Sequence, residues 1–94
     1  MSRLDSLRKR QKLLRTDISG RLDFVIGSVT AKGPSTYGFN LTTKVQGKTV
    51  SAYVPKALLE TARAMTQQHH KVKGLMLELS KVNWEILKLE AKKH

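Results

Sequence analysis

Residues 37–54 read YGFNLTTKVQGKTVSAYV, and this stretch decides the fold. Its two halves are rich in β-branched and aromatic residues, alternate apolar with polar side chains, and are separated by Gln46-Gly47. Glycine suits the positive φ of a two-residue turn, so the pattern predicts a β-hairpin with strands at 37–45 and 48–54. The expected pairs are Phe39 with Val54, Leu41 with Ala52, Thr43 with Val50 and Val45 with Lys48, which makes one face apolar along most of its length.

The segment before the hairpin predicts a helix and a first strand. Residues 2–20 combine a candidate N-cap, Ser2, with apolar residues at helical spacing, namely Leu4, Leu7, Leu14 and Ile18. Residues 24–30 are apolar and β-branched enough for a strand, and Lys32-Gly33-Pro34-Ser35 is typical of a turn. We therefore expect a small antiparallel sheet over 24–54, preceded by a helix over 1–20.

The segment after the hairpin predicts one long helix. Pro55 suits a first helical turn, and no proline interrupts the chain from there to about Lys92. The expected fold is α+β: a basic N-terminal helix (1–20), a small antiparallel sheet centred on the hairpin (24–54) and a long C-terminal helix (55–92). At 94 residues the chain is expected to form a single domain, 1–94.

Apolar residues in the long helix recur at heptad spacing, as in a helix that packs along another helix. We call this set the inner seam; it consists of Val72, Leu75, Leu79, Val82, Ile86 and Leu89. Met76, Leu77, Trp84 and Leu87 widen the apolar surface beyond it. The pattern predicts an interface with another chain, most simply in a homodimer, or with a protein partner, and it leaves open that the seam packs on the first helix.

Charge points to a polyanionic partner. Eighteen Lys and Arg against seven Asp and Glu give a formal net charge of +11, which exceeds the magnitude of roughly 2 to 8 typical of a small domain. We expect nucleic acid, DNA more than RNA, bound mainly through phosphates. The predicted contacts are Arg3, Arg8, Lys9, Arg10, Lys12 and Arg15 on the first helix, with Lys32, Lys44 and Lys48 as secondary contacts.

Nothing in the sequence indicates catalysis. The chain has no cysteine, and His69 and His70 are adjacent, so on a helix they point about 100° apart and are poorly placed for one metal ion. No glycine pattern matches a phosphate-binding or dinucleotide turn. We expect no enzyme activity, no metal and no cofactor. The absence of a long apolar run and of an apolar signal core predicts a cytoplasmic protein that does not span a membrane.

Several short motifs resemble those of a family of short uncharacterised prokaryotic proteins, some of them associated with mobile genetic elements. The motifs are Gly27-Ser28-Val29, Gly33-Pro34 with Tyr37 and Leu41, Gly47-Lys48-Thr49, Tyr53-Val54-Pro55-Lys56, and a leucine-rich helix with Leu79-Ser80. The resemblance covers about residues 24–87 and implies a hairpin followed by a long helix. Family members usually carry a cysteine-containing segment between the Gly-Ser and Gly-Pro motifs, where this chain keeps only Ala31-Lys32, so the metal knuckle that segment suggests is not carried over.

The sequence thus favours a non-enzymatic protein that binds nucleic acid, linked by the resemblance to a mobile element. The main alternative is an adaptor or inhibitor of a larger nucleic-acid enzyme, which would dock through the long helix. A third reading, in which residues 2–18 lie on an anionic membrane, is weakened because that segment has no Trp or Phe to anchor it.

Overall fold

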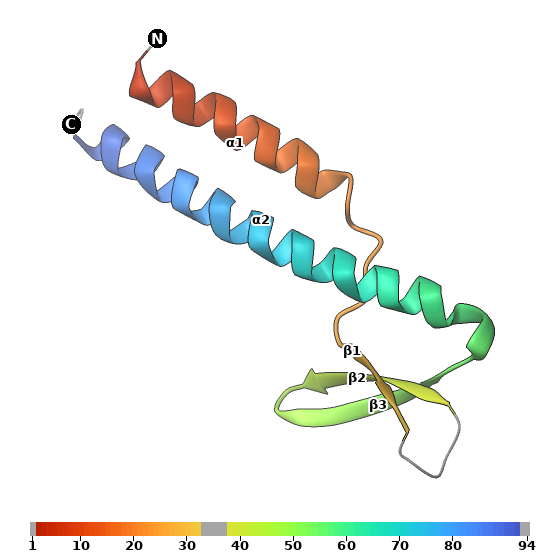
Figure 1. Cartoon of the computed structure of the whole chain (residues 1–94). Helices are drawn as coiled ribbons and strands as arrows, with labels where there is room; N and C mark the ends of the chain where they lie inside the picture. The colour runs from red at the N-terminus through yellow and green to blue at the C-terminus, as the bar shows by residue number, and fades with distance from the viewer. Residues whose placement is uncertain (1, 33–37, 93–94) are drawn as a thin grey trace. The chain divides into compact units, whose positions relative to one another are not determined.

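The computed structural model describes residues 2–32 and 38–92, and it confirms the α+β fold (Figure 1). The order of elements is α1 (Arg3–Ser19), β1 (Ser28–Ala31), β2 (Phe39–Val45), β3 (Lys48–Val54), a short 3-10 helix η1 (Lys56–Leu58) and α2 (Leu59–Ala91). The three strands form one antiparallel sheet in the order β1-β2-β3.

The contacts of the chain group it into two compact units. The helical unit consists of residues 1–22 and 71–94, and therefore contains α1 and the C-terminal part of α2. The sheet unit consists of residues 23–70, with the three strands, η1 and the beginning of α2. The expectation that residues 1–94 form a single domain stays a prediction.

The hairpin of β2 and β3 has the register that the sequence predicts. Phe39 pairs with Val54, Leu41 with Ala52, Thr43 with Val50 and Val45 with Lys48. The turn residues Gln46 (φ 51°) and Gly47 (φ 80°) both have positive φ, as a type I′ turn requires. The expected apolar face is covered only at one end, because Val54 is buried whereas Val45 and Val50 are each 51% exposed.

The first strand differs from its predicted bounds, because β1 begins at Ser28 and not at Phe24. The apolar residues before it contact α2 within the sheet unit instead of pairing with a strand. The Val25 N–H donates to the Met65 carbonyl at 3.4 Å, and the Phe24 ring lies 5.3 Å from that of His69. Gly33, Pro34 and Ser35 of the predicted turn, and Tyr37 of the first hairpin strand, lie outside the described residues.

Gly27 carries the chain from this apolar segment into the sheet. Its φ of +144° is one that L side chains rarely adopt, and a Cβ at this position would lie 2.6 Å from both the Thr42 carbonyl oxygen and the Thr43 hydroxyl. That hydroxyl also donates to the Ile26 carbonyl at 2.6 Å. Only glycine therefore lets the backbone pass this close to β2.

The two helices of the helical unit lie within the ranges that the sequence predicts for them, 1–20 and 55–92. Ser2 caps α1, since its hydroxyl accepts from the Asp5 N–H at 3.1 Å. On α1 Leu14 is 3% exposed, and on α2 Val72 and Ile86 are 2% and 7% exposed. The buried side of each helix is thus the side that its heptad-like apolar spacing predicts.

Candidate nucleic-acid interface

Arginines of α1 form ion pairs with glutamates in the C-terminal part of α2. Arg3 pairs with Glu85 at 3.5 Å, Arg10 pairs with Glu78 at 2.7 Å, and Arg8 pairs with Glu90. Beside them the Gln11 amide donates to the Asn83 side-chain oxygen at 2.8 Å. All of these contacts lie within the helical unit, so three of the six predicted phosphate contacts of α1 also hold the two helices together.

Glu85 lies between two cations. The Lys88 ammonium donates a hydrogen bond to its carboxylate and holds the pKa of Glu85 below its usual value of 4.5, and Arg3 acts in the same direction. The carboxylate therefore stays ionised over the whole neutral range.

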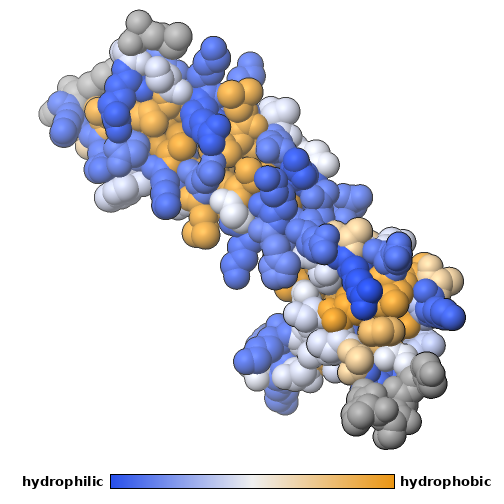
Figure 2. Space-filling model, in the orientation of Figure 1, coloured by the Kyte–Doolittle hydropathy of each residue, from blue (hydrophilic) through white to orange (hydrophobic). Residues whose placement is uncertain are grey.

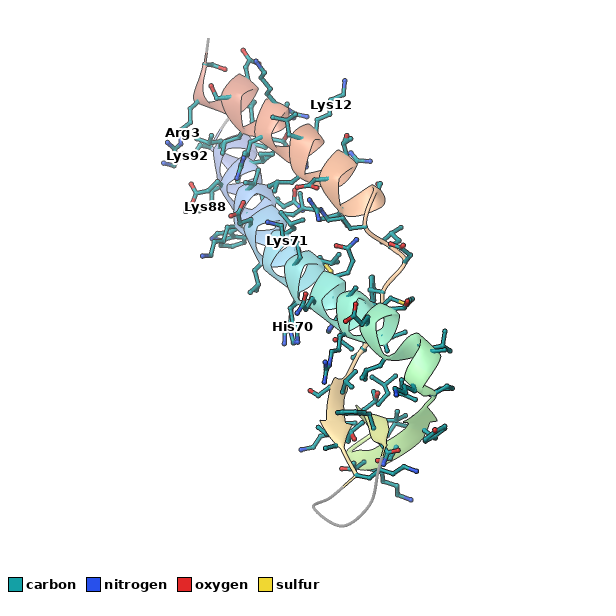
Figure 3. The ribbon with its side chains drawn as sticks, turned by 45° about the vertical axis from the view of Figure 1, so that its right-hand side comes forward. Arg3, Lys12, His70, Lys71, Lys88 and Lys92 are labelled. Atoms are coloured by element: carbon teal, nitrogen blue, oxygen red, sulfur yellow. The ribbon has the colours of Figure 1, made fainter. Side chains whose placement is uncertain are left out.

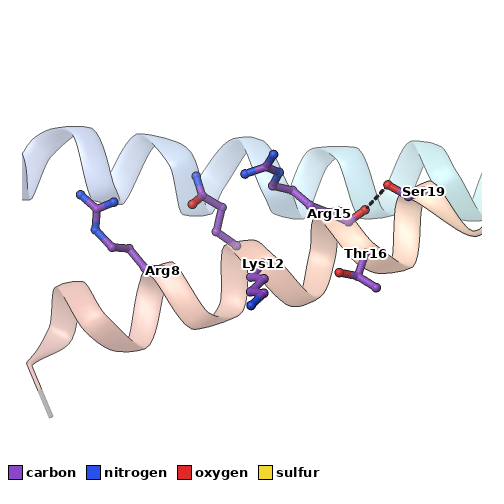
Figure 4. A pocket seen from close by; sticks show the side chains of 6 residues that line it. Arg8, Lys12, Arg15, Thr16 and Ser19 are labelled. Carbon is purple, nitrogen blue, oxygen red and sulfur yellow. Dashed lines mark hydrogen bonds between the residues drawn. The ribbon is translucent and has the colours of Figure 1, made fainter.

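The other three cations of α1 form no ion pair in the described part of the chain, and they are Lys9, Lys12 and Arg15. Two of them line an open depression of about 570 Å³ along the side of α1 (Figure 4). Its lining consists of Arg8, Gln11, Lys12, Arg15, Thr16 and Ser19.

The depression combines positive charge with hydroxyl groups. In Figure 4 the guanidinium groups of Arg8 and Arg15 lie on the side of α1 toward α2, while Lys12 and Thr16 lie on its outer side. The Ser19 hydroxyl donates to the Arg15 carbonyl at 2.8 Å and keeps its lone pairs for other partners. The Thr16 hydroxyl forms no hydrogen bond within residues 2–32 and 38–92. Cations and hydroxyls are the side-chain types that contact the sugar–phosphate backbone of nucleic acids.

Most of the net charge belongs to the helical unit. It holds thirteen Lys and Arg and five Asp and Glu, a formal net charge of +8 out of +11. Four of these cations lie on α2 and were not among the predicted contacts, namely Lys71, Lys73, Lys81 and Lys88, and Lys92 follows the helix directly. Lys71, Lys88 and Lys92 are labelled in Figure 3. These lysines are interspersed with apolar residues, so this part of the sequence shows no dense basic block like residues 8–12.

The predicted contacts of the sheet unit do not gather into one surface. The Lys32 ammonium lies 4.4 Å from the centre of the Tyr53 ring, in a cation–π contact. Lys44 pairs with Thr49 and Lys48 with Val45, so the two lysines occupy neighbouring pairs and point to opposite faces of the hairpin. Lys44 and Lys48 are both exposed near the turn.

The inner seam faces into the helical unit. Val72 and Ile86 are buried, and Leu75, Leu79, Val82 and Leu89 are half-buried. Because α1 presents its own buried residue, Leu14, and its glutamate-bound arginines to this part of α2, most of the seam is covered within the chain. Packing of the seam on the first helix is the alternative that the sequence left open, next to an interface with another chain.

The histidine pair offers no metal centre in the described ranges, where no group of three His, Cys, Asp or Glu side chains comes close enough to hold an ion. His69 is half-buried against Phe24, and His70 is exposed. Over the same ranges, no helix has the length and apolar character that crossing a bilayer requires.

No protein-family model matches the chain, and neither a curated protein nor a solved structure was found to be similar to it. Function therefore has to be inferred from the site itself.

Proposed function

We propose that the chain is a non-enzymatic, cytoplasmic protein that binds nucleic acid, DNA in the first place, through contacts from α1 to phosphates. The observation that supports this most directly is the depression along α1, whose lining combines the cations Arg8, Lys12 and Arg15 with the hydroxyls of Thr16 and Ser19. The link to mobile elements is part of the proposal and rests on the sequence resemblance alone.

The ion pairs of α1 are compatible with this role. Their arginine side chains are 54–68% exposed, and exposed pairs contribute only about 0–1 kcal/mol each. A phosphate can therefore replace Glu90 as the partner of Arg8 at little cost in free energy. Lys9, Lys12 and Arg15 can bind phosphates without breaking any ion pair. Affinity should be mainly electrostatic and independent of base sequence, because neither helix carries the turn-linked arrangement of a recognition helix.

The test is a salt titration of binding to labelled duplex DNA, single-stranded DNA and duplex RNA. We expect log Kobs to fall linearly with log salt, with a slope of about −0.9 for each phosphate contacted on duplex DNA. The variant Lys9→Gln/Lys12→Gln/Arg15→Gln should bind duplex DNA more weakly, and the magnitude of its slope should be smaller than that of the wild type by up to about 3.

The matched control is Lys56→Gln/Lys71→Gln/Lys73→Gln, which removes the same charge at three exposed lysines outside the depression. It lowers the long-range attraction but should leave the slope close to that of the wild type. Equal losses in the two triple variants would remove α1 as the binding surface, and no binding of any nucleic acid at low salt would defeat the proposal. A further variant, Lys44→Gln/Lys48→Gln, tests the secondary contacts of the hairpin.

A further inference from the structure

The helix α2 carries a second apolar face that the described residues, 2–32 and 38–92, leave exposed. We call it the outer stripe; its members are Met76, Leu77, Ser80, Trp84, Leu87 and Ala91. The four large side chains are 57% (Met76), 61% (Leu77), 58% (Trp84) and 56% (Leu87) exposed. In Figure 2 apolar side chains reach the surface over the region of α1 and the end of α2.

The outer stripe and the inner seam are different faces of one helix. At 100° per residue, Trp84 points about 160° away from Ile86, which is buried in the helical unit. Within the stripe, Leu77, Ser80, Trp84, Leu87 and Ala91 follow one another at steps of three, four, three and four residues. This is the spacing of a seam that packs against another helix, because it keeps the side chains on one narrow face.

We propose that the outer stripe is covered by the same stripe of a second copy of this chain, with the two α2 helices antiparallel about a two-fold axis. In this register Leu77 lies opposite Leu87 of the second copy, and Trp84 lies opposite Ser80. The small Ser80 leaves the room that the large indole needs, so the stripe is complementary to itself, as an interface about a two-fold axis must be.

The exposed area of the stripe is enough for a weak dimer. The exposed parts of its four large side chains amount to about 400 Å² per copy. Two copies with the stems of the flanking lysines then bury roughly 1,000 Å² in total, at the lower limit for a specific interface. We expect a dissociation constant in the range of about 1–100 µM.

The charges along the stripe give the association a characteristic salt dependence. Lys81 and Lys88 flank Trp84 on one edge, and in the antiparallel register Lys81 comes near Lys81 of the second copy. Both copies also carry the +8 of the helical unit. Salt screens this repulsion, so dimerisation should tighten as salt is raised, whereas an acidic partner helix on the same stripe would be bound less tightly.

The experiment is sedimentation equilibrium of the full chain at 5–500 µM without nucleic acid, in 0.05 and 0.5 M NaCl. We expect a monomer–dimer equilibrium that shifts toward the dimer at the higher salt. Trp84 is the only tryptophan, so its emission should shift to shorter wavelength over the same concentration range. A monomeric mass at every concentration in both salts, or association that weakens with salt, would overturn the proposal.

Variants test the surface and the register. Leu77→Ser/Leu87→Ser should remain monomeric, while Leu13→Ser/Leu22→Ser, which replaces two leucines that are 58% and 62% exposed elsewhere, should dimerise like the wild type. Ser80→Leu adds apolar surface but fills the space opposite Trp84, so it should weaken the dimer at least tenfold. Tighter association of Ser80→Leu would contradict the register, and equal dimerisation of the two double variants would contradict the surface. Circular dichroism checks that each variant keeps its helix content.

Discussion

At the scale of single residues, two glycines of this chain have opposite roles. Gly27 has a φ of +144°, and a Cβ there would lie 2.6 Å from two oxygen atoms of β2. Gly74 lies in the middle of α2, and a Cβ at this position would meet nothing within 4 Å. Replacing glycine by alanine should therefore lower the stability of the fold at position 27 and raise it at position 74.

We expect Gly27→Ala to lower the free energy of unfolding by about 2–4 kcal/mol, because the backbone has to move away from β2 to relieve strain and overlap. Gly74→Ala should raise it by about 0.5–1 kcal/mol, since alanine loses less entropy in a helix. Urea denaturation followed by circular dichroism measures both. A neutral Gly27→Ala would mean that the backbone at Gly27 does not pass this close to β2.

At the scale of helices and strands, the sequence predicts what depends on local periodicity. The hairpin register was predictable because alternation and a two-residue turn together fix every pair from Phe39 with Val54 to Val45 with Lys48. The start of β1 was not, because Phe24 and Val25 are apolar for contact with α2 and not for pairing in the sheet. Apolar composition does not distinguish these two uses.

The pairing of α1 with α2 depends on residues far apart in the chain. Arg10 and Glu78 are 68 positions apart, and no spacing rule connects them. The sequence also shows two apolar faces on α2 without telling which one α1 covers, because both follow helical spacing. The sequence predicted Lys9, Lys12 and Arg15 as contacts together with the arginines. Only the tertiary structure shows that Arg3, Arg8 and Arg10 pair with glutamates of α2 while those three do not.

Lys88 and Arg3 hold the pKa of Glu85 in the folded chain below the usual value of 4.5. The ionised carboxylate therefore stabilises the folded chain at every pH above the pKa that Glu85 has in the unfolded chain. The stabilisation should be lost as the pH falls below 4.5 and through the lowered pKa. We expect Glu85→Gln to be less stable than the wild type at pH 6 and to lose less stability between pH 6 and pH 3. Urea titrations at both pH values measure this difference.

The control for this experiment is Glu60→Gln, which removes a carboxylate that forms no ion pair in the described part of the chain. It should leave the pH dependence of stability close to that of the wild type. Were Glu85→Gln to follow the wild-type curve as well, its pairs with Arg3 and Lys88 would not form in solution.

At the scale of the whole molecule, net charge and ion pairs have opposite effects on stability. The chain carries +11, of which +8 lies in the helical unit, so repulsion among its cations destabilises the folded state. Three Arg–Glu pairs between α1 and α2 stabilise it, but each is exposed and weak. Salt screens both effects, and the direction of its net effect shows which one dominates.

We expect repulsion to dominate, because thirteen cations in the helical unit face only five carboxylates. Raising NaCl from about 0.02 to 0.3 M should therefore raise Tm by several degrees, since about 1 kcal/mol corresponds to 4–8 °C in a domain of this size. The variant Leu77→Ser/Leu87→Ser, which should stay monomeric, is used near 1 µM without nucleic acid, so that neither dimerisation nor binding contributes, and melting is followed at 222 nm. A fall in Tm would instead mean that the ion pairs between α1 and α2 outweigh the repulsion, and that phosphate must compete with them for Arg3, Arg8 and Arg10.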